Sequence, residues 1–437
     1  MNQIKFYYKD CLISEEDLIS NFYCLKEEID HLNNSLFLKY DDDRASINLP
    51  DDFESLNRVK TLIEEKKKLS PNYLIVVGIG GSNLGTIAIQ EAILGKLYNQ
   101  LNPEIKIFYA DTVDSDSIND IIQIIEPELG KNANVIVNGI SKSGGTTETI
   151  ANFQILVELI KKYKTDYEKY IIVTTDKNSK LWNLAIKIGF SVLEIPKKVG
   201  GRFSIFSPVG IFPLGLIGID IDDLQKGAKF MRDCCLKSEI KENPAALSAC
   251  IIYQHCKNKK NIHDTFIFSP DLESMGKWYR QLMSESIGKE YDKQHNQIFN
   301  GITPTVSIGS TDLHSMAQLY LGGPFDKFTT FIRVENNKRR IRIPNLLEFS
   351  NLVNNIQGKT LDEIMNAILN GVQNAFKNKN RPFIEIVLPD KSEESISQIL
   401  QMKIIEIIYL GHLMNVNPFN QPNVEDYKKE TKKFLTT

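Results

Sequence analysis

The sequence predicts an α/β protein with two doubly wound domains, each built on a mainly parallel sheet. Short apolar runs typical of buried strands alternate with helix-like segments long enough to serve as crossovers between parallel strands. This alternation weakens between 220 and 260 and then resumes, which divides the chain into two α/β units. The composition, 42% hydrophobic and 24% charged, is ordinary for a globular protein that buries a core.

The length of 437 residues is sufficient for two or three domains. We divide the chain into a helical N-terminal segment, a larger α/β domain, a helical connector, a second and smaller α/β domain, and C-terminal helices. The predicted boundaries are 1–70, 71–220, 221–262, 263–390 and 391–437.

The individual elements are predicted from local patterns. Leu18, Phe22 and Leu25 give partial helical periodicity within a charged N-terminal segment. Residues 393–414 form a strongly apolar helix, and Pro418 marks a bend before a lysine-rich terminal helix. Strand-like runs occupy 73–77, 105–109, 135–138, 170–174 and 191–195 in the larger unit, and 265–268, 305–308, 328–334 and 383–387 in the smaller one.

Charge and cysteine content narrow the function classes. Lysine plus arginine (52) nearly balance aspartate plus glutamate (55), and a net charge of −3 gives no reason to expect nucleic acid or an anionic membrane as partner. The six cysteines form no Cys-x-x-Cys, and Cys234 and Cys235 are sequence neighbours. The sequence shows no basic-then-apolar leader and no apolar run of membrane-spanning length. We therefore expect a reduced, cytoplasmic protein.

The most informative stretch is NGISKSGGTTETI, residues 138–150, which joins a strand-like run to a helical periodicity. Two serines flank Lys142, and Gly144-Gly145 and two threonines follow. Glycines let backbone amides approach a ligand, hydroxyls bond to its oxygens, and a helix N-terminus adds partial positive charge. Three hydroxyls and a lysine within six residues favour an anion site, and a phosphate ester suits it well.

This loop has two other interpretations. The spacing from Gly139 to Gly144 matches the first half of a P-loop, but Gly145 stands where its lysine is required. A nucleoside triphosphate is therefore not expected. An ordinary strand-to-helix turn also uses Gly, Ser and Thr, and this simpler interpretation stays open for the loop taken alone.

A second glycine-rich loop, Gly78 to Gly85, follows the first strand of the larger unit. It fails as a dinucleotide-binding fingerprint because Asn83 occupies the third glycine position, and Asp111 comes later than the expected acidic residue. Ser82 would instead form a second wall for the same phosphate. One such loop is weak support for anion binding, and two in one α/β unit are stronger.

Three further residues could carry chemistry, although each has a structural explanation when taken alone. Arg202 follows two glycines and could stabilise an oxyanion, but many arginines in such positions are surface ion-pair partners. Glu285 ends an amphipathic helix, where carboxylates are usually solvated. His314 opens a helix after a strand, where a histidine is usually structural. The six histidines show no paired metal-ligand spacing, so metal catalysis has no support.

Taken together, these stretches resemble the glucose-6-phosphate isomerase family in its shorter, bacterial-type form, from about residue 70 to the end. The Gly-Arg-x-Ser and Glu-Ser-x-Gly-Lys stretches are specific to that family, whereas the hydroxyl-rich loop is shared with other sugar-isomerase (SIS) domains. The resemblance implies two SIS-type α/β/α domains. The matching stretches are Gly78-Ile-Gly-Gly-Ser82, Ser141-Lys-Ser-Gly-Gly-Thr-Thr-Glu148, Gly200-Gly-Arg-Phe-Ser204, Glu285-Ser-Ile-Gly-Lys289 and the tail from Gln421 to Lys428.

The resemblance also implies a role for each matching residue. Glu285 is the expected base, Arg202 the group that stabilises the enediolate, and His314 with Lys428 the pair that opens the sugar ring. The residues expected to bind the phosphate and the sugar are Gly81, Ser82, Ser141, Lys142, Ser143, Thr146 and Gln421. The seven-residue spacing from Gln421 selects Lys428 over Lys429, although the lysine-rich surroundings leave that register open. Gly145 departs from related short forms, which often carry a threonine there.

The implied reaction interconverts D-glucose 6-phosphate and D-fructose 6-phosphate, in glycolysis and gluconeogenesis, through ring opening and a cis-enediolate. One proton moves between C1 and C2, so one positioned base suffices and no metal or redox cofactor is expected. The family is usually dimeric, and in a homodimer His314 would serve the neighbouring subunit's site. Two alternatives stay open. A dual phosphoglucose/phosphomannose isomerase would also accept mannose 6-phosphate, and a non-catalytic sugar-phosphate sensor would bind without turnover.

Overall fold

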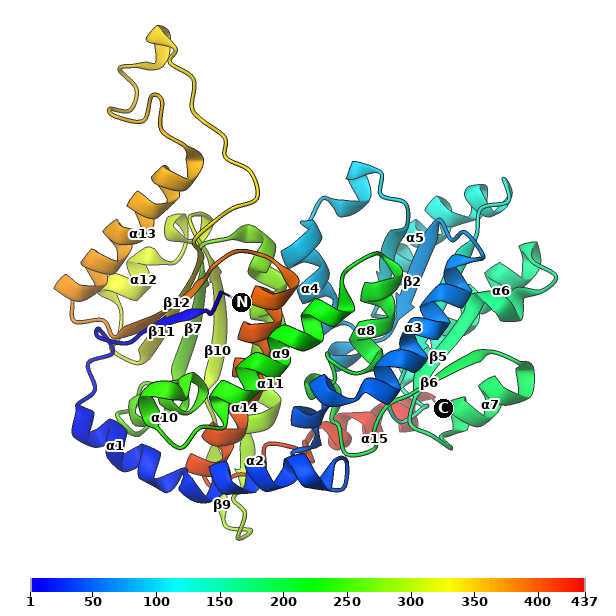
Figure 1. The fold of residues 1–437 in the computed structure, drawn as a ribbon, viewed down its shortest axis with the longest axis horizontal. Coiled ribbons are helices and arrows are strands. Elements are labelled where there is room, and N and C mark those ends of the chain that lie inside the picture. The colour runs from blue at the N-terminus through cyan, green and yellow to red at the C-terminus, as the bar shows by residue number, and fades with distance from the viewer. Residues whose placement is uncertain (1, 436–437) are drawn as a thin grey trace.

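The computed structural model describes residues 2–435 and contains two five-stranded sheets packed against helices (Figure 1). One sheet is wholly parallel and the other is parallel except for one edge strand, which confirms the predicted α/β class. No helix within residues 2–435 is long and apolar enough to cross a bilayer. The domain boundaries given above stay a prediction.

The first sheet lies between residues 73 and 194. Strands β2, β4 and β5 are buried along their whole length, which is why they read in the sequence as continuous apolar runs. The five strands predicted for this unit are confirmed to within two residues. The strands are β2 (Tyr73–Val77), β3 (Lys106–Ala110), β4 (Val135–Ile140), β5 (Ile171–Thr175) and β6 (Ser191–Glu194), and the helices between them are α4 (Leu84–Leu94), α5 (Ser115–Leu129), α6 (Thr147–Tyr163) and α7 (Lys180–Ile188).

The chain order of this sheet reverses between β2 and β4. The strands lie in the order β3-β2-β4-β5-β6, so β3 follows β2 on one side and β4 lies on the other. Open α/β sheets bind ligands at such a switch point, beyond the carboxyl ends of the two strands. The loops that follow β2 and β4 are the two glycine-rich loops recognised in the sequence, so the topology places both at this position.

The second sheet has the strand order β1-β12-β11-β7-β10. Strand β1 is antiparallel to β12 and all other neighbouring pairs are parallel. The four predicted strands of this unit are present, and β7 and β10 begin earlier than predicted. The strands are β1 (Lys5–Tyr7), β7 (Ile262–Ile267), β10 (Thr303–Ile308), β11 (Lys327–Val334) and β12 (Phe383–Leu388).

Strand β1 differs from the expectation of a wholly helical segment at 1–70. Its three residues pair with Glu385 to Val387 near the other end of the chain. A run of three residues is too short to carry a periodic signal, and its partner is distant in sequence, so the pattern gave no indication of it. The helices expected in this segment are present as α1 (Glu15–Cys24), α2 (Lys26–Leu38) and α3 (Phe53–Lys67).

Helix α14 (Glu393–Leu413) runs through the centre of the molecule (Figure 1). Nearly all of its residues are buried, in keeping with its apolar sequence, and it packs against α9, α10 and α11. The terminal helix α15 (Val424–Leu435) is the opposite case, since none of its described residues is buried. The remaining helices are α8 (Pro208–Leu216), α9 (Ile221–Cys235), α10 (Pro244–Lys257), α11 (Glu273–Ile287), α12 (Ala317–Gly322) and α13 (Leu361–Asn378), and a hairpin pairs β8 (Lys289–Tyr291) with β9 (Gln297–Asn300).

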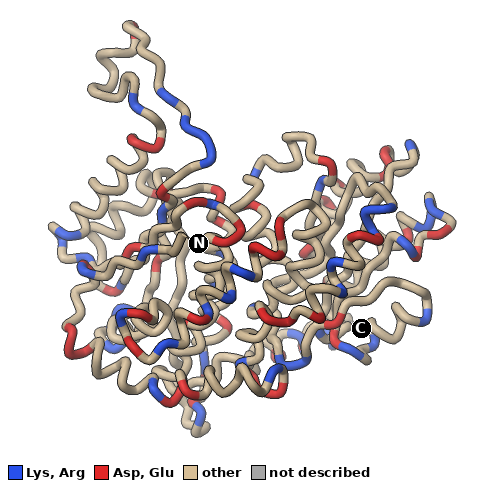
Figure 2. Tube along the Cα trace, in the orientation of Figure 1, with Lys and Arg blue, Asp and Glu red and all other residues tan. Residues whose placement is uncertain are grey.

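A long excursion between β11 and α13, residues 335–360, extends away from the body at the top of Figure 1. We call it the arm. Figure 2 shows Lys and Arg gathered on one side of it, within residues 338–342. Its apolar side chains are unusually exposed, with Leu347 at 89% and Leu352 at 73%. Such a group of apolar side chains on an extended segment is typical of an interaction surface.

Candidate active site

The two glycine-rich loops lie side by side at the switch point. A Cβ added at Gly78 would stand 3.1 Å from the carbonyl oxygen of Ile140, so the loop after β2 begins against the end of β4. Ser82 ends a short 3-10 turn, Gly80–Ser82, and α4 begins two residues later. Ser82 and the hydroxyl-rich loop after β4 therefore follow the ends of neighbouring strands, an arrangement in which both could face one phosphate.

The hydroxyl-rich loop is closed on itself by hydroxyl groups. The Ser141 and Thr146 hydroxyls are 2.9 Å apart, and the Thr146 amide donates to the Ser141 hydroxyl at 3.4 Å. Gly144 has φ +68°, a conformation that favours glycine. Thr146 is the N-cap of α6 but makes no side-chain capping bond, so it leaves first-turn amides of this 17-residue helix uncapped. Such amides are well suited to bind a phosphate.

Lys142 was expected to bind the substrate phosphate, but its ammonium contacts two backbone carbonyls. Its ammonium donates to the carbonyl oxygens of Lys197 at 2.7 Å and Val199 at 2.8 Å. Burial lowers the pKa of Lys142. The side chain therefore ties the hydroxyl-rich loop to the segment that precedes Gly200 and Arg202.

The loop that carries Arg202 touches the loop after β2. A Cβ added at Gly81 would lie 2.3 Å from the carbonyl carbon of Gly201, so only glycine allows the two backbones to approach this closely. A Cβ at Gly80 would lie 2.9 Å from the amide nitrogen of Gln281, on α11. The loop after β2 thus contacts both the arginine loop and α11.

Arg202 is the centre of the site. Its side chain is 2% exposed, and Nη1 donates to Glu285 Oε2 at 3.2 Å and to Gln421 Oε1 at 2.8 Å. Nε donates to the Ser286 hydroxyl at 2.7 Å. Burial lowers the pKa of Arg202 to about 10, although the Glu285 carboxylate opposes the shift. Three of the residues predicted from sequence, from three distant parts of the chain, therefore meet here.

The other terminal nitrogen of Arg202 holds the segment before Gln421. Nη2 donates to the carbonyl oxygens of Pro418 at 2.5 Å and Asn420 at 3.1 Å. All five N–H groups of the guanidinium are thereby matched by five acceptors. Such a rigid fork fixes the relative positions of α11 and residues 418–421.

Glu285 lies in the last turn of α11 and its side chain is 30% exposed. Oε2 accepts from Arg202, and Oε1 accepts from the Gln281 amide at 3.0 Å. Gln281 precedes Glu285 by four residues, so the two side chains stand on one face of the helix. The carboxylate is held on both oxygens and still reaches solvent, which suits a base that must contact a substrate.

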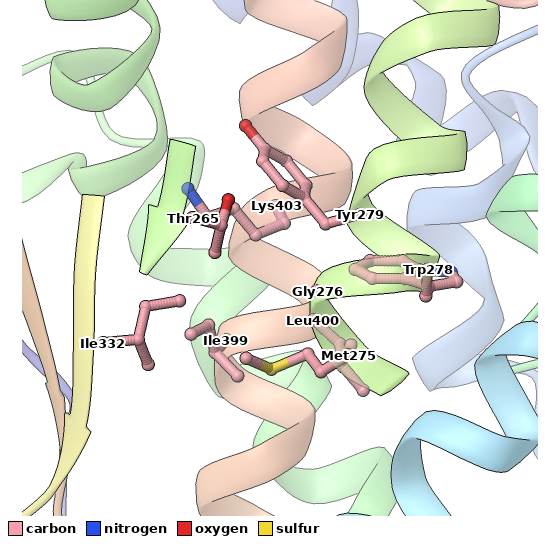
Figure 3. Close-up of a pocket in the computed structure, with 9 residues that line it drawn as sticks. All are labelled: Thr265, Met275, Gly276, Trp278, Tyr279, Ile332, Ile399, Leu400 and Lys403. Atoms are coloured by element: carbon pink, nitrogen blue, oxygen red, sulfur yellow. The ribbon is translucent and has the colours of Figure 1, made fainter. Parts of the chain in front are cut away.

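The helix that carries Glu285 is anchored in the interior. Figure 3 shows Tyr279 of α11 near Lys403 of α14, whose ammonium lies 4.6 Å from the centre of the tyrosine ring. The Tyr279 hydroxyl donates to Glu406 at 2.5 Å, and Lys403 forms a buried ion pair with the same carboxylate at 2.8 Å. A Cβ at Gly276 would lie 2.6 Å from Val306, so α11 packs closely on β10. These contacts fix the helix that carries Glu285 against the interior of the protein.

Within residues 2–435, neither His314 nor Lys428 makes a hydrogen bond or ion pair with Arg202, Glu285 or Gln421. His314 ends the 3-10 turn Thr311–His314 after β10 and is exposed, and its ring makes no hydrogen bond or ion pair with any other residue between 2 and 435. Lys428 lies on α15 and pairs with Glu425 at 2.8 Å. The structure thus groups the predicted base, arginine and glutamine with the two glycine-rich loops, and in the described part of the chain it shows no hydrogen bond or ion pair between this group and the predicted ring-opening pair.

Sequence reasoning missed three residues of the cluster. Gln281 could have been found from its helical spacing to Glu285. Ser286 and Lys289 belong to the Glu-Ser-x-Gly-Lys stretch, but the sequence assigned no role to either. Their partners, Arg202 and the carbonyl of Asn420, are far away in the chain, so no local pattern pointed to them.

Known proteins resemble this chain closely. A model of the phosphoglucose isomerase family matches residues 65–436. The glucose-6-phosphate isomerase of Carboxydothermus hydrogenoformans is 35% identical over 379 residues, which cover 85% of this chain and 80% of that relative. The glucose-6-phosphate isomerase of Rubrobacter xylanophilus is 30% identical over 437 residues, covering 99% of this chain and 98% of the relative.

Solved structures extend the likeness to the fold. A hypothetical protein from Thermus thermophilus superposes with a TM-score of 0.86 at 27% identity, over 100% of both chains. A glucose-6-phosphate isomerase from Chlamydia trachomatis superposes with a TM-score of 0.83 at 19% identity, over 99% of this chain and 88% of that one. At that identity the second likeness concerns the fold alone.

Proposed function

The chain belongs to the phosphoglucose isomerase family, and from this premise we propose that the cluster around Arg202 and Glu285 is the active site of an aldose-ketose isomerase. The enzyme interconverts D-glucose 6-phosphate and D-fructose 6-phosphate. The observation that carries the site assignment is the Nη1 group of Arg202, which donates to both Glu285 and Gln421 beside the two phosphate loops.

The substrate phosphate binds between the loops after β2 and β4. Ser82, Ser141, Ser143 and Thr146 supply hydroxyls, and the uncapped N-terminus of α6 supplies amides. Lys142 contributes positive charge and holds the neighbouring Arg202 loop through its two carbonyl contacts. Tight binding of the unreactive phosphate provides energy that keeps the open-chain sugar in line with the base.

Glu285 moves the proton. For the aldose, the carboxylate takes the proton from C2, the C–H electrons form the C1–C2 double bond, and the carbonyl electrons move onto O1 as an enediolate. Returning the proton to C1, with transfer of the O2 proton to O1, gives the ketose, with C2=O2 and an O1 hydroxyl. Arg202 faces the carboxylate and offers a fixed positive charge to the enediolate oxygen, which would replace one of its present acceptors.

Ring opening is assigned to His314 and Lys428, and we place His314 in the site of a second subunit. Support for this comes from the exposure of His314 and from the contacts of the Glu285 carboxylate in its own chain, which are to Arg202 and Gln281 and not to His314. The exposed apolar side chains of the arm provide a surface that a second copy could cover. A homodimer in the cytoplasm is therefore part of the proposal.

The test is a coupled assay on the purified protein, with wild type and Glu285→Gln compared. The amide keeps the size of the side chain but cannot accept the proton. We expect the variant to fall below about a hundredth of the wild-type rate, the low end of a general base's contribution, while sugar-phosphate binding persists. A Glu285→Gln variant faster than that would show that Glu285 is not the base. Wild-type protein that binds the sugar phosphate without any turnover would favour a sensor.

A further inference from the structure

We propose that Lys289 is a positioning residue for the isomerase reaction, because its ammonium joins the end of α11, which carries Glu285, to the segment 418–421, which ends in Gln421. The proposal rests on the function assigned above and adds to it a residue that touches neither the phosphate loops nor the reacting atoms. Lys289 would set the distance between the base and the substrate-contacting glutamine.

The contacts of Lys289 are both made to backbone oxygens. Nζ donates to the carbonyl of Glu285 at 2.8 Å and to the carbonyl of Asn420 at 2.5 Å. The first is one of the last carbonyls of α11, which have no partner within the helix. Cations near a helix C-terminus satisfy such groups and interact favourably with the helix dipole. The second carbonyl belongs to the residue immediately before Gln421.

The segment 418–421 is also held from two other directions. Arg202 Nη2 donates to the same Asn420 oxygen and to the oxygen of Pro418. The ring of Phe419 lies 5.8 Å from the ring of Phe203 and 5.9 Å from the guanidinium of Arg44. Gln421 therefore follows a segment in which the oxygens of Pro418 and Asn420 accept hydrogen bonds and the Phe419 ring is packed. Lys289 joins this segment directly to the C-terminal end of α11, beside the bridge that Arg202 makes between the same two parts.

The charged form of Lys289 is disfavoured at this position, because the side chain is buried and close to Arg202. The residue is 6% exposed, and burial, followed by repulsion from Arg202, lowers the pKa of Lys289 to about 8 against the attraction of Glu285. An apolar side chain would avoid that cost, so the geometry of the two carbonyl contacts is the feature that lysine supplies. Residues that are unfavourable for stability, such as this buried lysine, are found most often at functional sites.

The matched pair of variants is Lys289→Met and Lys293→Met. Methionine keeps the length and apolar stem of lysine and removes its donors, and Lys293 is an exposed lysine four residues further along. For Lys289→Met we expect kcat to fall by about 100-fold, the effect of a misplacement near 1 Å. The inhibition constant of inorganic phosphate should stay within about twofold, since phosphate binds the remote loops. Lys293→Met should match wild type in both.

A second readout separates ring opening from proton transfer. Exchange between the α and β anomers of glucose 6-phosphate, followed by NMR, needs ring opening but not the base. Glu285→Gln should slow isomerisation while anomer exchange continues. Lys289→Met should slow both, because it displaces Gln421 and the segment leading to Lys428 as well as the base.

If the methionine variant does not fold, chemical rescue tests whether the ammonium of Lys289 is needed. In Lys289→Ala, added ethylammonium can occupy the space of the lost side chain and donate to the same two carbonyls. Recovery of at least about tenfold in kcat supports the proposal, and no recovery overturns it. A Lys289→Met enzyme above about a third of wild-type kcat, or a loss of phosphate binding equal to the loss of kcat, also overturns it. Failure of wild type to isomerise at all would instead remove the proposed function.

Discussion

Arg202 and Glu285 are 83 residues apart in the chain, yet the guanidinium donates to the carboxylate at 3.2 Å. The arginine comes from the loop after the first sheet and the glutamate from a helix of the second half. A buried cation next to a half-exposed carboxylate is suited to a base whose reaction develops negative charge on the neighbouring oxygen.

Replacing Arg202 by methionine should reduce kcat by about 10² to 10³, the usual effect of removing one preorganised donor from a developing oxyanion. Arg202→Lys keeps the charge but loses the fork, so its kcat should lie between those of wild type and Arg202→Met. Steady-state kinetics on both variants check this. An Arg202→Met enzyme with more than about a tenth of wild-type kcat would contradict the role.

Ser143→Ala should weaken substrate binding with little effect on the chemical step. A hydrogen bond to a charged group contributes about 1.5 to 3 kcal/mol, so we expect KM to rise by roughly tenfold or more while kcat changes by less than about threefold. The matched control is Thr61→Ala, at an exposed hydroxyl on α3, which should leave KM unchanged. A kcat loss without a KM change would place Ser143 in the chemistry instead.

Mixing two inactive variants tests whether His314 acts across a subunit interface. In a dimer formed from His314→Ala and Glu285→Gln chains, one of the two sites would hold both intact residues. Random pairing makes about half of the dimers mixed, so co-expression should restore about one quarter of wild-type activity. If His314 serves its own chain, the mixture stays inactive, and native mass spectrometry with an affinity tag on one of the two chains shows whether the mixed dimers formed.

Glu406→Ala should destabilise the protein by about 3 to 5 kcal/mol, because it leaves Lys403 buried without its carboxylate. Urea unfolding followed by circular dichroism measures the change. The control is Glu430→Ala on α15, which breaks an exposed ion pair with Lys433 and should cost less than about 1 kcal/mol. Equal effects of the two substitutions would show that the interior ion pair does not anchor α11.

The first sheet could be predicted almost completely because its central strands are buried on both faces. Their continuous apolar runs are bounded by glycine-rich loops, and each loop carries its own local signal. Strand β1 could not be predicted, since its three residues acquire their conformation from pairing with β12. The arm has neither a periodic apolar pattern nor a buried face, so nothing in the sequence indicated that these residues extend away from the body.

The site divides in the same way. The two glycine-rich loops after β2 and β4 have local signals, so residue types and spacing were enough to predict them as an anion site, which stays a prediction. The contacts of Arg202 depend on segments near 285 and 420, so the sequence could indicate these residues through resemblance but not their distances. Lys142 shows most clearly that residue type does not determine a contact. A lysine in this loop is a suitable phosphate ligand, yet its ammonium donates to two backbone carbonyls.

Strand β1 also affects the order in which the two sheets can fold while the chain is being synthesised. All strands of the first sheet lie before residue 195, so that half can assemble while the rest is still being made. The second sheet needs its earliest strand and its last one together, and the Ile4 amide donates to Gln398 across 394 residues. A nascent chain therefore carries an unfinished second half until residue 388 has emerged. Deleting residues 2–10 would leave the edge of β12 open to pair with another molecule, with aggregation as the expected result.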